Sequence, residues 1–216
     1  MIYKLARLIR YILGKDSSGL GQRQAKPDLA DIRADHLGRY EFAKRYIKAG
    51  ARVLDCACGT GYGSFLLARD TDLVSITAVE KDKAAVKFAQ RHYCASRIRY
   101  LLGDVFFLDI ENSCFDCIVS FETLEHVDGD ALIKLFYQKL KPGGVLVVSS
   151  PNQDREPFNK RKFPFHLRHY RPDEFENLLS SNGFEIIGRY TQFERENITV
   201  SEGWEGLFNI AVVKKR

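Results

Sequence analysis

Short apolar runs alternate with segments of helical periodicity along the chain. Strands are predicted where nearly every position is apolar or β-branched, because parallel strands are buried on both faces. The predicted strands are residues 51–54, 74–79, 97–102, 115–121, 145–149, 184–192 and 207–214. The predicted helices are residues 31–47, a segment with an apolar face at 65–68, and residues 83–93, 130–140 and 172–182. This alternation predicts an α/β fold with a doubly wound, mostly parallel sheet of seven strands, preceded by N-terminal helices.

The first 28 residues have a different pattern. In residues 1–15 one helix side carries Ile2, Leu5, Ala6, Ile9, Ile12 and Leu13, and the other carries Lys4, Arg7, Arg10 and Lys15. A basic amphipathic helix can lie on an anionic membrane surface as a peripheral contact. Alternatively it packs on its own domain or on a neighbouring subunit of a homodimer. Residues 16–28 contain Gly, Ser, Gln and Pro27 and are predicted to be a linker, which leaves residues 29–216 as the main domain.

Composition narrows the class of protein. The 216 residues are 45% hydrophobic, which suits one α/β domain with a filled core. No apolar run approaches the roughly 20 residues of a membrane-spanning helix. The net charge of +5 is too small to indicate nucleic-acid binding. Five cysteines without a secretory signal indicate reduced thiols and a cytoplasmic protein, at the inner face of a membrane if residues 1–15 bind lipid. Cys114-x-x-Cys117 has no second Cys/His pair at ligand spacing, so no metal is expected.

An acidic residue and a glycine-rich turn follow the first predicted strand. Asp55 ends the strand, and Gly59, Gly61 and Gly63 come after it. Glycine tolerates positive φ and lets the backbone approach a ligand closely. Bare backbone N–H groups at a helix start attract a pyrophosphate. A carboxylate at the strand end favours instead a cationic or hydroxyl-bearing ligand.

The run 55–63 resembles the first motif of the class I S-adenosylmethionine-dependent methyltransferases, an acid followed by Gly-x-Gly-x-Gly. Ala57 stands where that family usually has its first glycine. The resemblance covers about residues 36–214. It implies a Rossmann-like sheet with the last strand inserted antiparallel beside the fifth, and S-adenosylmethionine as the cofactor. The cofactor-binding residues that it implies in this motif are Asp55, Ala57, Cys58, Gly59 and Gly61.

Two later strands also end at acids. Glu80 lies about 20 residues past the glycines, where a carboxylate can accept both ribose hydroxyls of an adenosine ligand. Lys81, its neighbour, is placed in the same site. Asp104 follows the third strand, where a turn or a helix cap is the ordinary role of an acid. The resemblance implies that Asp104 binds the adenine amino group and that Val105 cradles the ring.

Two further segments are similar to methyltransferase motifs. The string 36–43 is similar to a helix that covers the cofactor, in which Arg39 or Tyr40 would meet the methionine carboxylate. A solvated helix face is the alternative for Arg39. Phe121, Glu122 and the residues up to 127 resemble the loop after the fourth strand in ubiquinone-biosynthesis-type and related small-molecule methyltransferases. There the loop walls the methyl-transfer site.

Three histidines are candidates for a catalytic base. His126 could accept a proton at neutral pH, or could form a structural hydrogen bond at a helix start. His166 and His169 lie in residues 151–172, which contain six basic residues, two acids and interleaved aromatics. This segment follows the carboxyl end of a strand, where ligand-facing loops lie in open α/β sheets. It is interpreted as a cap that binds the acceptor, with a solvated basic loop as the alternative.

The leading hypothesis is a methyltransferase that uses S-adenosylmethionine and positions two reactants for in-line transfer. The basic cap favours a small anionic acceptor, such as a sugar-, nucleotide- or lipid-linked metabolite, because Arg and Lys pair with phosphates. O-methylation is the expected reaction. One alternative is an NAD(P)-dependent oxidoreductase, but the sixth position from Gly59 is Ser64 rather than the Gly or Ala of a dinucleotide fingerprint. The other is a non-catalytic module that binds the cofactor.

Overall fold

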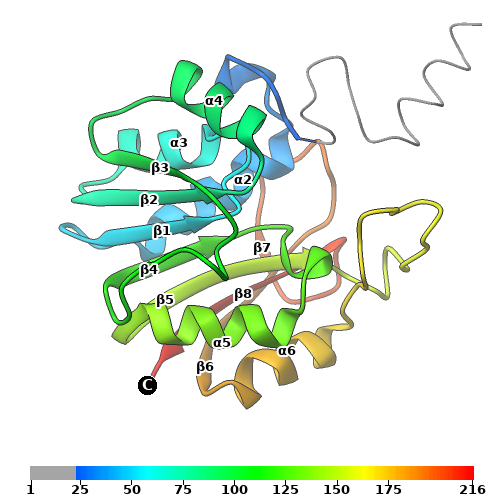
Figure 1. The fold of residues 1–216 in the computed structure, drawn as a ribbon. Coiled ribbons are helices and arrows are strands. Elements are labelled where there is room, and N and C mark those ends of the chain that lie inside the picture. The colour runs from blue at the N-terminus through cyan, green and yellow to red at the C-terminus, as the bar shows by residue number, and fades with distance from the viewer. Residues whose placement is uncertain (1–22) are drawn as a thin grey trace, which may run out of the picture.

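Five parallel strands form one half of a mixed sheet in the computed structural model, which describes residues 23–216 (Figure 1). In the centre, β1 (Arg52–Cys56) pairs with β2 (Ser75–Glu80) and with β4 (Phe115–Ser120). β3 (Ile98–Leu102) pairs with β2, and β5 (Leu140–Pro151) pairs with β4. The helix predicted at residues 1–15 and the linker up to residue 22 lie outside the described residues.

The other half of the sheet is antiparallel. β8 (Phe208–Lys215) inserts between β5 and β6 (Phe184–Gln192), and β7 (Ser201–Glu202) pairs with the outer side of β6. The strand order is β3-β2-β1-β4-β5-β8-β6-β7. The predicted doubly wound, mostly parallel sheet with an inserted antiparallel strand is therefore confirmed. The prediction of seven strands missed β7, because its two residues are too few to show an alternating pattern.

Helices cover both faces of the sheet (Figure 1). α2 (Ala34–Ala43), α3 (Tyr62–Asp70) and α4 (Lys83–His92) lie on one face, and α5 (Gly129–Lys139) and α6 (Pro172–Ser181) lie on the other. Val53 of β1 packs in the core under the first group and Leu54 in the core under the second, as the two-residue period of a strand requires. Of the helices in residues 23–216, none is long and apolar enough to span a bilayer.

Three short 3₁₀ helices change the predicted boundaries. η1 (Leu29–Asp31) and η2 (Lys44–Tyr46) flank α2, so the helix predicted over 31–47 is interrupted at both ends. η3 (Leu124–His126) lies between β4 and α5. Asp82 caps α4 by accepting hydrogen bonds from the backbone N–H groups of its first turn, which otherwise lack partners.

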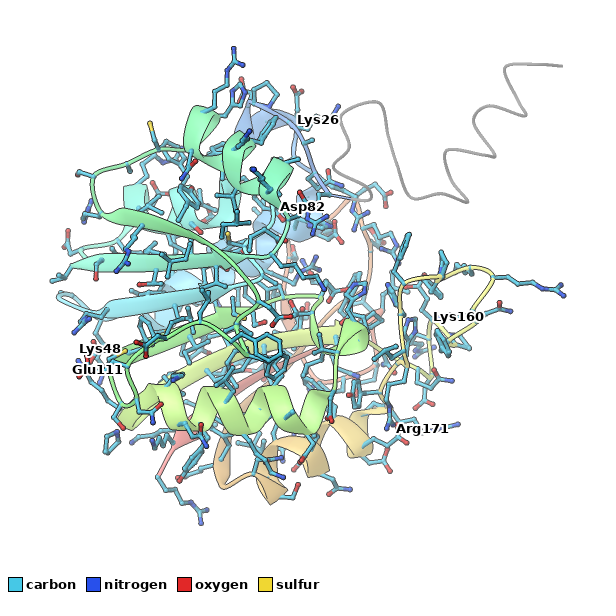
Figure 2. The ribbon with its side chains drawn as sticks, viewed as in Figure 1. Lys26, Lys48, Asp82, Glu111, Lys160 and Arg171 are labelled. Carbon is cyan, nitrogen blue, oxygen red and sulfur yellow. The ribbon has the colours of Figure 1, made fainter. Side chains whose placement is uncertain are left out.

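The chain builds the sheet outward in one direction from β1 to β3 and in the other direction from β4 to β5, so the strand order reverses between β1 and β4. Ligands bind at such a switch point, beside the carboxyl ends of the strands. Figure 2 shows Asp82, which follows β2, and Lys160, which follows β5, toward this edge of the sheet. Lys48 and Glu111, which precede β1 and β4, lie at the opposite edge (Figure 2).

The segment between β5 and α6 leaves the edge of the sheet, and its two ends pair with each other where it returns. Asn152 and Tyr170 form an isolated parallel bridge, and the backbone N–H of Gln153 donates to the Tyr170 carbonyl over 3.0 Å. The Asn209 side chain of β8 donates to the same carbonyl over 2.9 Å. Residues 153–169 therefore form a loop with closed ends that projects beyond the sheet (Figure 1). We call it the cap.

Candidate active site

A cavity of about 1170 Å³ lies at the carboxyl ends of β1, β2 and β4 and extends to the cap. Thirteen of the sequence-predicted residues line it: Arg39, Tyr40, Ala57, Cys58, Gly59, Glu80, Lys81, Asp104, Val105, Phe121, Glu122, His126 and His166. Asp55, Gly61 and His169 do not. The structure therefore brings most of the predicted site residues together around one cavity. Asp55, Gly61 and His169 contact other parts of the protein instead.

The turn after β1 has one glycine open to the cavity and one that packs inward. An added Cβ on Gly59, at φ +57°, would meet nothing within 4 Å. An added Cβ on Gly61, at φ +85°, would lie 2.6 Å from Ala89 Cβ and 2.7 Å from Tyr100 Oη. Gly61 does not line the cavity, and its missing side chain makes room for α4 and β3, so the expected contact of its backbone with the ligand stays a prediction. Ala57 has φ +61°, a strained value for a residue with a Cβ.

Asp55 lies below the cavity wall, with its carboxylate held by two hydroxyls of the chain. Ser64 Oγ donates to Asp55 Oδ2 over 2.6 Å, and Tyr40 Oη donates to Oδ1 over 3.1 Å. Burial raises the pKa of Asp55 to about 7, although these two hydrogen bonds act in the opposite direction. Asp55 supports Tyr40 and the turn rather than facing a ligand. The sequence argument that this carboxylate selects a cationic or hydroxyl-bearing ligand therefore does not apply to Asp55.

Glu80 is 4% exposed at the end of β2, and three groups already donate to it. Its Oε2 accepts from the Gly59 N–H over 3.1 Å, and its Oε1 accepts from the Asp82 N–H over 2.9 Å. Arg23 Nη2 also donates to Oε1, over 2.8 Å. Glu80 thus joins the glycine turn to the start of α4 and presents a carboxylate at the cavity wall.

Asp104 and Val105 line the cavity after β3. Asp104 Oδ1 accepts a hydrogen bond from the Phe106 N–H over 3.1 Å, which is the turn contact expected of an acid at this place. The turn contact occupies one of the two carboxylate oxygens with a backbone partner.

Arg39 is 1% exposed, so the alternative of a solvated helix face is wrong. Its Nη1 donates to Gln192 Oε1 over 2.7 Å and lies 3.5 Å from Asp35 Oδ2. The guanidinium carbon lies 4.7 Å from the centre of the Phe208 ring. Its Nη2 has no hydrogen-bond partner among the described residues. A buried N–H group at a cavity wall is costly unless a ligand accepts from it, and a carboxylate fits that requirement.

The loop after β4 brings two carboxyl groups, those of Glu122 and Glu125, to the part of the cavity beside the cap. Glu122 adopts φ +52°, a strained backbone value, and its Oε1 accepts from Ser149 Oγ over 2.8 Å. Glu125 is 1% exposed, and its Oε2 has no hydrogen-bond partner among the described residues. Burial, followed by the charge of Glu122, raises the pKa of Glu125. The sequence analysis did not single out Glu125, although its place beside His126 was a usable signal.

The three candidate histidines are joined through the cap. His126 Nδ1 lies 3.0 Å from the Phe165 carbonyl, and His166 Nδ1 lies 2.8 Å from His169 Nε2. His169 Nδ1 lies 2.5 Å from the Glu156 carbonyl. Burial lowers the pKa of all three, to about 3 for His166. His169 does not line the cavity, and its Nε2 lies behind His166, so a role as catalytic base stays a prediction for His169.

The positive charge of residues 151–172 is mostly directed away from the cavity. Of the six basic residues only Lys162 lines it, whereas Arg168 pairs with Glu174 and Arg171 pairs with Asp154. Lys162 Nζ lies 3.1 Å from Glu156 Oε1, and Arg195 Nη2 lies 2.5 Å from Glu156 Oε2. The cavity charge is therefore mixed, and most of the basic residues of the predicted cap lie outside the cavity.

Several cavity residues were not among the predicted site residues, and some of them come from distant parts of the chain. They include Arg23, Arg33, His36, Tyr62, Glu125, Glu156 and Arg195. His36 contacts Arg33 Nη2 over 2.7 Å and Tyr62 Oη over 2.8 Å, and burial lowers its pKa to about 3. Only the folded chain shows these contacts, because no local pattern marks them.

Comparisons with known proteins agree with this geometry. Residues 54–148 match a family model described as a methyltransferase domain. A protein of Mycolicibacterium smegmatis, named a probable S-adenosylmethionine-dependent methyltransferase, is 33% identical over 64% of this chain and 53% of its own length. Phosphoethanolamine N-methyltransferase of Triticum aestivum is 29% identical over 65% of this chain and 29% of its own length. The chain thus spans about half or less of these relatives.

A solved structure shows the same fold. The S-adenosylmethionine-dependent methyltransferase of Mesorhizobium loti superposes with a TM-score of 0.67 at 15% identity, over 82% of this chain and 98% of that one. The sheet topology, the glycine turn and the carboxylate of Glu80 at the cavity wall agree with these matches. Together the family match, the relatives and the solved structure support a methyltransferase domain of the class I S-adenosylmethionine-dependent type in this chain.

Proposed function

We propose that the protein transfers the methyl group of S-adenosylmethionine to a hydroxyl oxygen of a small acceptor that carries an anionic group. The observation that carries this proposal is the continuity of one cavity. Gly59 and Glu80 line its cofactor end, and Glu122, His126 and the cap line its other end. Its volume of about 1170 Å³ exceeds the range of roughly 300–1,000 Å³ that is typical of single-ligand pockets, so two reactants have room.

The cavity residues fit the cofactor group by group. Glu80 offers a carboxylate to two ribose hydroxyls, and Arg39 Nη2 offers an unpaired donor to the amino-acid carboxylate. Gly59 leaves open space at the wall, where the turn can approach the ligand. S-adenosylmethionine supplies a methyl group activated by a positively charged sulfur. Phe121 and Tyr40 meet edge to face with ring centres 5.0 Å apart and make the wall between the two ends of the cavity aromatic.

The acceptor end supports an oxygen nucleophile. A hydroxyl must lose its proton as its oxygen takes the methyl group, and His126 lies at this end with the two carboxyl groups. His166 is a weak base, because burial lowers its pKa to about 3 and proton transfer is most efficient near the working pH. The role of the histidines is therefore better described as holding the acceptor than as simple base catalysis.

An anionic group on the acceptor is supported by Lys162, Arg195 and Lys81, which line the cavity. Glu156 already pairs with two of them, so an acceptor phosphate or carboxylate would share these cations. The wheat relative is named for phosphoethanolamine, which carries a phosphate. That name also specifies N-methylation, and an amine acceptor is the outcome that would revise the oxygen assignment.

The test combines binding with methyl transfer. We expect calorimetric titration to detect S-adenosylmethionine but not NAD(H) or NADP(H), and labelled methyl groups to enter an acceptor from a metabolite extract. Mild base and acid treatment of the labelled product would distinguish an ester, an ether and an amine. Binding of a nicotinamide cofactor with no binding of S-adenosylmethionine would overturn the proposal. Cofactor binding without label transfer from any extract would reduce the protein to a binding module.

A further inference from the structure

We propose that Glu125, His126 and His166 bind one divalent transition-metal ion at the acceptor end of the cavity. One ligand atom from each of the three residues lies within 4.8 Å of the others. Ligand atoms about 2.0–2.2 Å from a shared ion lie roughly 3–4 Å apart, so small side-chain rotations complete the site. Two of the ligands come from η3, and the third comes from the cap.

The hydrogen bonds of the two histidines direct a lone pair to the site. His126 Nδ1 faces the Phe165 carbonyl, which only accepts, so Nδ1 carries the proton and Nε2 is left with its lone pair. His169 Nδ1 faces the Glu156 carbonyl and therefore donates as well. His169 Nε2 must then accept from His166 Nδ1–H, which leaves His166 Nε2 with its lone pair. Histidines that bind metals usually donate their other N–H to such a partner.

Glu125 supplies the independent observation that points to a ligand. Its side chain is 1% exposed and lines the cavity, yet Oε2 has no hydrogen-bond partner among the described residues. A buried carboxylate oxygen without a partner costs free energy that a bound cation would recover. His126 Nε2 lies 3.9 Å from Oε1 of the same carboxylate. A neutral imidazole with its lone pair on Nε2 cannot donate to that oxygen, whereas a metal ion binds both groups.

The strained backbone of Glu122 supports the same assignment. Its φ of +52° sets the course of the loop that carries Glu125 and His126. Strained residues persist where the surrounding structure holds them, and they concentrate at functional sites. The Leu167 N–H donates to the Glu125 carbonyl over 2.6 Å, so the loop and the cap are fastened beside the three ligands.

The donor set selects the class of ion. Two imidazole nitrogens and one carboxylate suit Zn²⁺, Co²⁺, Fe²⁺ or Mn²⁺, whereas Mg²⁺ and Ca²⁺ prefer oxygen ligands. Three protein ligands leave a position for water or for an acceptor hydroxyl. In that position an ion lowers the pKa of the hydroxyl, whose proton passes to water while the oxygen forms its bond to the methyl carbon and the carbon–sulfur bond breaks. This catalytic role rests on the proposed function, but metal binding itself does not.

The test measures metal binding without any cofactor. The full chain is stripped with a chelator and titrated with ZnCl₂ and with CoCl₂, with calorimetry and the visible absorption of Co²⁺ as readouts. We expect one ion per chain and a rise in the melting temperature on binding. Glu125→Gln and His166→Ala should each weaken binding by about 100-fold or more, since each removes a ligand. His169→Gln should weaken it by about tenfold, as expected for a positioning residue.

His92→Ala is the matched control, because His92 is exposed on α4 and does not line the cavity. The affinity of this variant for the metal ion should equal that of the wild type. Glu125→Gln keeps the shape of the side chain and serves where His166→Ala fails to fold. Equal binding by the wild type and both ligand variants, or no binding above that of a denatured control, overturns the metal site. Metal binding by a protein that does not bind S-adenosylmethionine would instead refute the proposed function and leave the metal site standing.

Discussion

Arg23 Nη2 donates a hydrogen bond to Glu80 Oε1 over 2.8 Å, so the carboxylate assigned to the ribose already holds a guanidinium. Arg23 Nη1 also lies 3.6 Å from Asp82 Oδ2. The Gly59 and Asp82 N–H groups also donate to Glu80, so with Arg23 its carboxylate accepts hydrogen bonds from three donors. A carboxylate has about four lone-pair sites, so two ribose hydroxyls cannot bind while all three donors remain. Binding of both ribose hydroxyls by Glu80, as proposed, therefore requires Arg23 to release the carboxylate.

Replacing Arg23 with Ala should raise the affinity for S-adenosylmethionine by about two- to fivefold, because a partly exposed ion pair contributes roughly 0.2–1 kcal/mol and the ribose no longer has to displace it. Calorimetric titration at low salt measures the change. Arg91→Ala, an exposed change on α4, should leave the affinity as it is. Weaker binding by Arg23→Ala would mean that the guanidinium holds the cofactor instead of competing with it.

Glu80→Ala should weaken S-adenosylmethionine binding at least about tenfold, since two charge-assisted hydrogen bonds contribute roughly 1.5–3 kcal/mol each. Thermal unfolding must show that the variant still folds, because Glu80 also holds the Gly59 N–H. Glu185→Ala, an exposed acid of β6, is the control. An unchanged affinity in folded Glu80→Ala would exclude Glu80 from the ribose site.

Substitutions at the two positive-φ glycines of the turn, Gly59 and Gly61, should have different effects on stability and on cofactor binding. Gly61→Val should lower the free energy of unfolding by at least about 2 kcal/mol, because its Cβ would collide with Ala89 and Tyr100. Gly59→Ala should cost only about 1 kcal/mol of stability, because its Cβ meets no protein atom, but it should weaken cofactor binding by intruding on the cavity. Urea unfolding and calorimetry on both variants separate the two effects. Cofactor loss without destabilisation in Gly61→Val would contradict the structure.

Asp55 should make the stability of the wild type fall as the pH rises from about 4 to about 7. Burial raises its folded-state pKa to about 7, above the unfolded value of 3.8, so the folded state binds more protons in this window. Asp55→Asn lacks that titration and should be more stable than the wild type at about pH 8, with the difference shrinking toward about pH 4. Denaturant unfolding at several pH values gives the difference. Asp109→Asn, at an exposed position, should show no such trend, and a pH-independent difference for Asp55→Asn would refute the buried-carboxyl account.

The fold was predictable because its strands are buried and its helices are amphipathic. The apolar runs at β2 and β4 gave their strands to within one residue at each end. β1 extends two residues beyond the prediction to Cys56, since Asp55 pairs with Ala78 within the sheet. β7 was missed because its pairing with β6 depends on the neighbouring strand and not on a pattern of its own.

The site was easiest to predict at the carboxyl ends of strands. Glu80 ends β2, Asp104 and Glu122 lie two residues beyond β3 and β4, and all three line the cavity. Arg195 was missed because it reaches Glu156 from a loop 39 residues away in the chain. Asp55 and Gly61 were placed at the ligand because sequence shows that a residue is near a turn but not which way its side chain points.

The closed ends of the cap have a consequence for how such a protein can evolve. Asn152 and Tyr170 meet at one bridge, so residues 153–169 can lengthen or shorten without moving β5 or α6. The free-energy cost of closing a loop grows only slowly with its length. Glu80 and the glycine turn lie on elements that do not depend on that loop. On the proposed function, changes in length or sequence confined to this one insertion would alter the acceptor and leave the binding of the methyl donor as it is.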